Sequence, residues 1–496
     1  MMSALSACVK DRLDKLQSGS WNPEIAIPLV DSRIGMERLI GDLEEDGFIT
    51  TDDDNVIVIV YQGTLFEIHA EDMFKLNDVS FDLAALQNFG ITNYPSTQFF
   101  LRTLELKEGT LKVHIENDTQ EDVRVTLNMP KSTKSGVPFA ESFTIKYAGG
   151  SITTFDTLFD ISGYYIDLSG NGNEHNKLKI HYEANKISNN DSVLIDVFQV
   201  EFKDMKYEFI DGNLGNVKFT TEDDSIKLDI FKNFKSGRII LQDPKFKLDI
   251  ENGFGIPIHL SFGNFEGVGK GGNEQLGGNI IDDGINVKAP TSDGSKVNTN
   301  ETIDSSNSNI SQFLSISPES LWFNFNLEAN ADGDTSLYNF ISSTSSLVGK
   351  IDLRIPLKGS LDSVIIEDTY DFENSDIANL ERATFKLVTN NSFPVGLYIQ
   401  IYFLDEDENI LDSLIETNSA LFREAFTDAE GFSISAVREE TYFTIGEERF
   451  APIRINAKKL RIRVMLLTDD SDTKSIKITT EDYFDLKLGV RASLNF

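Results

Sequence analysis

The chain has 496 residues, of which 40% are hydrophobic and 10% aromatic, so we expect about three domains with packed cores and exclude a wholly disordered chain. Its 45 Lys and Arg stand against 80 Asp and Glu, a net charge of −35, and a field of this sign repels phosphate groups, so we expect no nucleic-acid partner. The single cysteine, Cys8, excludes an intramolecular disulfide and a cysteine-based zinc cluster, and no apolar run reaches the roughly 20 residues of a transmembrane helix.

Residues 1–22 are expected to be a polar tether, and residues 23–92 a small N-terminal α/β segment. Within this segment, Asp31–Gly47 predicts a short helix, because a polar capping residue precedes apolar residues at helical spacing, namely Met36, Leu39, Ile40 and Leu43. The apolar stretch Asn55–Gly63 (NVIVIVYQG) predicts a strand.

A strand motif that ends in asparagine occurs three times at nearly equal intervals. LKVHIEN, FKLDIEN and FKLVTNN end at Asn117, Asn252 and Asn391, and apolar and polar residues alternate in each. A second alternating strand follows each motif, within Glu121–Met129, Ile256–Asn264 and Pro394–Phe403. Asparagine tolerates left-handed backbone and bonds its own backbone, so we expect these residues to start hairpin loops in a structural role.

Three such units predict an all-β fold of tandem β-sandwich domains. The expected boundaries are 93–216, 217–375 and 376–496, after the small N-terminal segment with its short helix. Within the second domain, residues 263–311 are rich in Gly, Asn, Ser and Asp and are expected to form a long loop. A second, weaker helix is expected in residues 336–349.

Motifs for catalysis are missing from the sequence. The five histidines do not lie at metal-ligand spacing on a helix, and neither H-E-x-x-H nor G-x-S-x-G occurs. The stretch GVGKGG lacks the Ser or Thr that follows the lysine of a phosphate loop. We therefore expect no catalytic residues, no cofactor and no enzyme activity.

One acidic segment has two interpretations. Asp405, Asp407, Asn409 and Glu416 occupy positions like those of an EF-hand loop, but Ile410 stands where that loop needs glycine. The segment is either a solvated hairpin turn or a weak calcium site.

The opening residues resemble a bacterial lipobox. In LSAC, Leu5, Ser6 and Ala7 precede Cys8, which the resemblance implies is lipidated. Only Met1–Ala4 come before it, so we expect either that the natural start lies upstream or that the chain has been trimmed; an accidental match is the alternative. Lys10 and Asp11 resemble the lipoprotein export signal of the Bacteroidota.

Three further stretches, at 18–40, 243–262 and 390–414, resemble large envelope proteins of the Bacteroidota. The strand–Asn unit is also similar to the late-embryogenesis-abundant type of β-sandwich. In Bacteroidota envelope proteins, O-glycosylation occurs at Asp-Ser/Thr followed by an apolar residue, which implies candidate sites at Thr157, Ser192, Ser363 and Ser413.

These resemblances imply a non-enzymatic outer-membrane lipoprotein, on the periplasmic or the surface face, that acts as a structural and protein-interaction module. Its expected partners are the membrane, through the lipid anchor, and envelope proteins, among them an outer-membrane barrel. Two alternatives remain open: the periplasmic plug subunit of the type 9 secretion translocon, and a surface glycan-binding protein.

Overall fold

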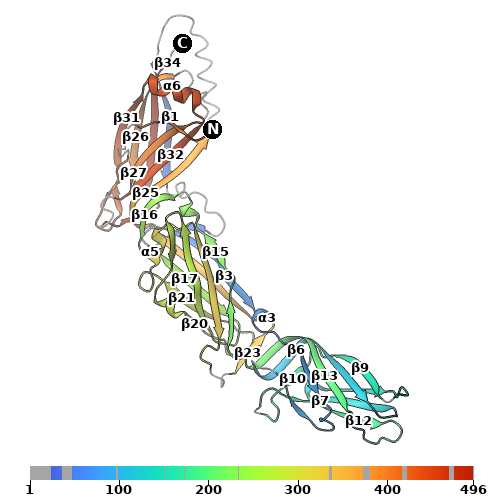
Figure 1. Ribbon diagram of the computed structural model, residues 1–496. Coiled ribbons are helices and arrows are strands. Elements are labelled where there is room, and N and C mark those ends of the chain that lie inside the picture. The colour runs from blue at the N-terminus through green and yellow to red at the C-terminus, as the bar shows by residue number, and fades with distance from the viewer. Residues whose placement is uncertain are drawn as a thin grey trace.

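Antiparallel β-strands build three sandwiches that follow one another in a row in this computed structural model (Figure 1). The structure describes residues 24–35, 47–95, 99–150, 152–172, 174–232, 234–333, 338–371, 380–415, 422–468 and 474–494. We number the sandwiches I to III in the order in which the chain completes them. The expected all-β sandwich fold is confirmed, and the helices in the described ranges are short.

Sandwich I lies at one end of the row and is formed by a nine-stranded sheet. Its strands are β4 (Val79–Asp82), β6 (Phe100–Asn117), β7 (Val123–Lys134), β8 (Val137–Ile145), β9 (Thr153–Asp160), β10 (Tyr165–Asp167), β12 (His181–Lys186), β13 (Val197–Asn213) and β23 (Asn339–Ser342). β5 (Ile91–Asn93) pairs separately with β11 (Lys177–Lys179). The rings of Phe143 and Phe155 stack with centroids 4.9 Å apart, which closes the core between β8 and β9.

Sandwich II, in the middle, consists of a five-stranded and a six-stranded sheet. The first contains β2 (Gly47–Thr51), β3 (Ile57–His69), β24 (Ser346–Pro356), β17 (Lys245–Asn252) and β21 (Val297–Ile303). The second contains β14 (Val217–Thr220), β15 (Asp224–Lys227), β22 (Ser320–Ala329), β18 (Ile258–Gly269), β19 (Gly272–Gln275) and β20 (Ile285–Val287). The short helices are α3 (Ala70–Met73), η1 (Asp229–Phe231), α4 (Asn279–Asp283) and α5 (Ile310–Ser315).

Sandwich III lies at the other end of the row and pairs a four-stranded with a six-stranded sheet. The first contains β1 (Glu24–Gly35), β34 (Tyr483–Leu494), β26 (Leu380–Asn391) and β31 (Val437–Ile445). The second contains β16 (Phe234–Leu241), β25 (Lys358–Asp371), β32 (Lys459–Leu467), β27 (Gly396–Leu404), β28 (Ile410–Ser413) and β33 (Ile476–Lys477). β29 (Phe426–Thr427), β30 (Ser433–Ser435) and α6 (Glu447–Asn456) complete it.

The start of the chain runs along the whole row and contributes to all three sandwiches. β1 pairs with β34 in sandwich III, β3 pairs with β24 in sandwich II, and β4 pairs with β13 in sandwich I. The chain then builds most of sandwich I, adds β14 and β15 to sandwich II and β16 to sandwich III, and continues with sandwich II. It returns to sandwich I for β23 and to sandwich II for β24 before it finishes sandwich III. The sandwiches are therefore interleaved in sequence.

This path corrects the expected domain boundaries. The residues of the predicted segment 23–92 form no separate α/β unit, because their main strands are distributed over all three sandwiches. Residues 217–375 likewise contribute β16 and β25 to sandwich III. An edge strand finds its partner through backbone hydrogen bonds, and its own apolar pattern does not specify which sheet it joins.

The two helices expected from the sequence and the expected long loop differ from the structure. The helix expected over Asp31–Gly47 is wrong for residues 31–35, which continue β1, while residues 36–46 lie outside the described ranges. The described part of 336–349 contains β23 and the start of β24 in place of the second helix. The expected long loop 263–311 instead carries β19, β20, β21 and two short helices, because β21 pairs with β17 along its full length.

The three repeated motifs form strands as predicted, but the hairpins are wrong. β6, β17 and β26 end at the three asparagines, and β7, β18 and β27 follow. β17 pairs with β21 and β24, whereas β18 pairs with β19, β20 and β22 in the opposite sheet. β26 and β27 also belong to different sheets. The connection after each of these two asparagines is therefore an arch that crosses from one sheet of the sandwich to the other.

Candidate functional site

The joint between sandwiches I and II is held by a buried pair of asparagines. Asn330 Nδ2 donates to Asn339 Oδ1 at 2.7 Å, and Asn339 Nδ2 donates back to Asn330 Oδ1 at 3.2 Å. Both residues also bond the short connection from β13 to β14, through Gly215 O and the Leu214 amide. Because β23 extends the sheet of sandwich I, this pair ties the two sandwiches together.

The joint between sandwiches II and III is closed by backbone hydrogen bonds. The Ile57 amide donates to Ile478 O, the Ile478 amide donates to Leu357 O, and the Leu357 amide donates to Ile57 O, at 2.7–3.0 Å. Leu357 is the only residue between β24 of sandwich II and β25 of sandwich III. Three chain segments therefore meet in a closed ring of amide–carbonyl bonds, a rigid arrangement compared with a flexible linker.

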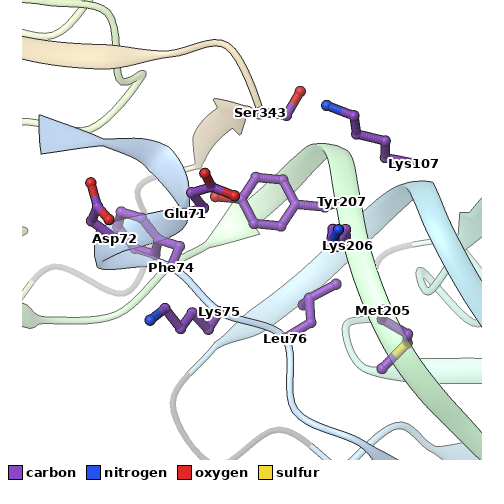
Figure 2. Close-up of a pocket in the computed structure, with 10 residues that line it drawn as sticks. All are labelled: Glu71, Asp72, Phe74, Lys75, Leu76, Lys107, Met205, Lys206, Tyr207 and Ser343. Carbon is purple, nitrogen blue, oxygen red and sulfur yellow. The ribbon is translucent and has the colours of Figure 1, made fainter.

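A cleft opens beside the first joint, with a volume of about 450 Å³ (Figure 2). It is lined from one side by α3 and the residues after it, and from the other by β6, β13 and Ser343. The lining residues are Glu71, Asp72, Phe74, Lys75, Leu76, Lys107, Met205, Lys206, Tyr207 and Ser343. Of these, Phe74, Met205 and Tyr207 are buried and form the apolar wall of the cleft.

The most unusual group in the cleft is the hydroxyl of Tyr207. The residue lies on β13 where the pairing with β6 shifts register, and it is only 5% exposed. Its hydroxyl oxygen is buried and has no hydrogen-bond partner among the described residues. Figure 2 shows the ring with its hydroxyl end directed towards Glu71. Burial, with a further contribution from the carboxylates of Glu71 and Asp72, raises the pKa of Tyr207 above the usual tyrosine value, so the group stays a neutral hydroxyl.

Charged groups of both signs surround this hydroxyl. Glu71 and Asp72 lie on α3, and Asp72 also accepts a hydrogen bond from the His69 amide at 3.0 Å. Lys206 pairs with Glu108 at 2.9 Å, and Ser343 Oγ donates to Glu208 at 3.1 Å. Lys75 and Lys107 bring two further ammonium groups to the lining. The cleft thus offers carboxylate acceptors, ammonium donors and a buried hydroxyl, which is a set suited to binding a polar molecule.

The asparagines of the repeats are buried and bonded to the backbone of their own connections. Asn252 and Asn391 are fully buried and Asn117 is 1% exposed. Asn117 Oδ1 accepts from the Thr119 amide at 3.2 Å. Neither these residues nor their neighbours line the cleft, so their role is structural.

The structure places the remaining predicted site residues apart from one another. Ser192 and Ser363 are exposed, while Thr157 and Ser413 are half-buried. In the acidic segment, Asp405 accepts from the amide of Asn409 at 2.8 Å and from its side chain at 3.0 Å, so its carboxylate is engaged within the turn. Cys8 and Glu416 lie outside the described residues.

In the part of the chain that the structure describes, no group of three or more His, Cys, Asp and Glu side chains could hold a metal ion. His114 and His259 lie on strands and bond Asp156 and Asn286, each at 2.9 Å. Across the same residues, no helix is long and apolar enough to cross a membrane.

Sequence reasoning missed the cleft altogether. Tyr207 occupies an inward position of a strand with ordinary alternation, and nothing in its neighbours' identity distinguishes it from a core tyrosine. It lies where the register between β6 and β13 is irregular, and the acids near it belong to α3, far away in the chain.

Comparison with known proteins does not identify a family. No family model and no curated protein matches the chain. A crystal structure of a protein inferred to be secreted, from Parabacteroides distasonis ATCC 8503, is 15% identical with a TM-score of 0.29, over 55% of this chain and 82% of that chain. The tandem CBM22 domains of Xyn10C from Paenibacillus barcinonensis are 9% identical with a TM-score of 0.16, over 56% and 86% of the two chains. The VP2 subviral particle of infectious bursal disease virus is 9% identical with a TM-score of 0.17, over 81% and 75%. These low scores carry no argument about function.

Proposed function

We propose that this protein is a non-enzymatic, lipid-anchored rod of the bacterial cell envelope that holds sandwich I away from the membrane for contact with a protein partner. The observation that carries the proposal is the construction of the two joints, one with a buried asparagine pair and the other with a ring of backbone hydrogen bonds. A protein that only needed three tethered modules would not require such joints.

The path of β1 supplies the orientation of the rod. Glu24 pairs with Ser493 at the free end of sandwich III, and Gly35 pairs with Tyr483 near the joint to sandwich II. A lipid on Cys8, shortly before β1, would therefore put sandwich III nearest to the membrane. β3 has 13 residues and runs from one joint to the other, about 40 Å at ~3.3 Å per residue. Three sandwiches of this length give a rod on the order of 100 Å.

Sandwich I is the favoured contact region for a partner. β8 pairs only with β7 and β9 only with β6 among the described strands, so both present an open edge that can accept an added strand. Large apolar side chains are also exposed on this sandwich: Phe89 at 75%, Leu194 at 71%, Val137 at 66% and Leu158 at 65%.

Anchoring is tested by metabolic labelling with an alkyne-bearing palmitate in a Bacteroidota host that carries the complete gene. We expect the protein to carry the label and to be recovered in the membrane fraction. Cys8→Ala should abolish both the labelling and the membrane association, while Ser18→Ala should leave both unchanged. Labelling that survives Cys8→Ala, or an unmodified Cys8 in the native protein by mass spectrometry, would overturn the anchor.

Partner contact is tested with a photo-crosslinking amino acid introduced at Leu194 in sandwich I or at Tyr442 in sandwich III, both exposed. We expect crosslinks to one envelope protein from position 194 and none from position 442. A large outer-membrane barrel among the products would favour the secretion-plug role. Equal yields from both positions would contradict a distal contact region.

A further inference from the structure

We propose that the cleft between sandwiches I and II binds a neutral, hydroxyl-rich ligand of the size of one or two sugar rings, with the Tyr207 hydroxyl as its buried hydrogen-bond partner. The inference is independent of the envelope role, since it depends only on the groups that line the cleft. It concerns a site apart from the open edges of sandwich I.

The first argument for a ligand in the cleft comes from the Tyr207 hydroxyl. A buried hydroxyl without a partner costs folding free energy, and native proteins keep few such groups. The Tyr207 side chain lines the cleft, so a polar atom of a ligand can reach the hydroxyl once the groups that cover it shift. It can donate one hydrogen bond and accept another, and a ligand hydroxyl matches both roles.

The mixture of charges is the second reason. Glu71 and Asp72 favour hydrogen-bond donors, while Lys75 and Lys107 favour acceptors, and Lys206 is already paired with Glu108. An anionic ligand would be repelled by the two carboxylates, and a cationic ligand by the ammonium groups. Neutral hydroxyls donate to carboxylates and accept from ammonium groups, so a polyol can satisfy both sides of the cleft at once.

Size and shape supply the third reason. The volume of about 450 Å³ lies within the range of about 300–1,000 Å³ typical of small-molecule sites. The half-buried Leu76, backed by the buried Phe74 and Met205, gives an apolar spot on which the C–H face of a sugar ring can pack. Because the lining comes from both sides of the joint, a bound ligand would contact sandwiches I and II together.

Saturation-transfer NMR on the full chain tests the proposal with maltose, cellobiose and sucrose as neutral probes, and with glutarate and cadaverine as charged probes of comparable length. We expect at least one disaccharide to show saturation transfer, and neither charged probe. Tyr207→Phe should weaken the affinity for that disaccharide about tenfold or more, because it removes only the hydroxyl. Tyr442→Phe, at an exposed tyrosine of sandwich III, should leave the affinity unchanged.

Glu71→Ala provides a second variant, since Glu71 is exposed and its truncation does not disturb the core. We expect it to weaken binding about threefold or more, and this result decides the matter if Tyr207→Phe does not fold. Saturation transfer to none of the disaccharides, transfer to a charged probe alone, or an affinity that neither variant changes would overturn the proposal. None of these results bears on the anchor at Cys8.

Discussion

Asn252 and Asn391 make the same three hydrogen bonds at equivalent points of two different sandwiches. Each side-chain oxygen accepts from the amide two residues later, at 2.8 Å from Phe254 and 2.9 Å from Phe393. Each Nδ2 donates to the carbonyl four residues later, at 3.0 and 2.9 Å. Each also donates to the carbonyl of a distant segment, Lys288 O or Arg423 O, at 2.9 Å. One side chain thus fixes the arch and its neighbouring loop in both sandwiches.

Replacing Asn252 or Asn391 by alanine should destabilise its own sandwich by about 2–3 kcal/mol, because each substitution leaves one amide and two carbonyls without their partner. Asn117→Ala should cost less, because the shorter of the two hydrogen bonds that its side chain makes is 3.2 Å long. Hydrogen exchange measured by mass spectrometry checks this: exchange should rise in β17 and β18 for Asn252→Ala and in β26 and β27 for Asn391→Ala.

The half-buried Asn390 serves as the matched control, since its amide donates to the Tyr483 hydroxyl at 3.2 Å and also bonds the Asp485 side chain, both away from the arch. Asn390→Ala should cost about 1 kcal/mol or less. Equal losses for Asn390→Ala and Asn391→Ala would contradict the role given to the arch.

Breaking the asparagine pair at the first joint should loosen the rod. Asn339→Ala removes the acceptor of Asn330 and of the Leu214 amide inside a buried site, so we expect a loss of about 1–3 kcal/mol. Small-angle X-ray scattering should show a wider distribution of overall dimensions than for the parent chain. Asn298→Ala, at an exposed position of β21, is the control and should change neither the stability nor the distribution of overall dimensions. Unchanged scattering for Asn339→Ala would mean that other contacts hold the joint.

The alternation of apolar and polar residues predicts the strands of the repeats but not how these strands are connected. Alternation in Lys245–Asn252 and its two counterparts reports which residues face a core, and β6, β17 and β26 appeared where they were expected. The same alternation is compatible with a hairpin or an arch, because both begin with a strand and a polar turn. Asn252 was therefore assigned correctly to a turn and wrongly to a hairpin, and it does not need the left-handed backbone that we expected, since its φ is not positive.

Long-range pairing could not be predicted for a different reason. β1 meets β34 across almost the whole chain, and neither strand carries a signal for the other beyond a suitable length. The cleft is invisible in the sequence for the same reason, since Glu71 and Tyr207 meet only after β3 and β13 have been placed. In residues 263–311, the polar composition reflected outward faces of β19 and β21, whereas Thr299 and Ile303 of β21 point inward and are buried.

The Tyr207 hydroxyl leads to a stability prediction that contrasts it with a second buried tyrosine. Tyr182 is fully buried and donates to Ala84 O at 3.1 Å, so Tyr182→Phe should lose about 1 kcal/mol. Tyr207→Phe removes a hydroxyl without a partner and should leave the ligand-free chain equally or more stable. Urea unfolding curves of the two variants check the contrast. A loss for Tyr207→Phe as large as that for Tyr182→Phe would reveal a protein partner for the Tyr207 hydroxyl.

Removal of β1 should affect sandwich III selectively. Deleting residues 1–35 takes away a strand that pairs with β34 from Glu24 to Gly35 and exposes the edge of β34. We expect faster proteolysis and hydrogen exchange in β34 and β26, with β6 and β13 of sandwich I unchanged. A deletion of residues 1–20, which retains β1, is the control. Equal protection of β34 in both deletions would show that the β1 pairing contributes little.

The link between β1 and β34 should also respond to pH. Arg33 donates two hydrogen bonds to the Asp485 carboxylate, at 2.6 and 2.9 Å, and this contact holds the pKa of Asp485 below its usual range. A carboxyl group whose pKa is lowered on folding adds stability above its unfolded pKa of about 3.9 and loses it as the pH falls through the folded value. Asp485→Asn should therefore lower the unfolding midpoint at pH 7, and the difference from the parent chain should shrink below about pH 4 and vanish once the pH is below the lowered pKa of Asp485. Urea unfolding from pH 7 to pH 3 measures this, and a difference that stays constant over that range would mean that the charge of Asp485 does not contribute.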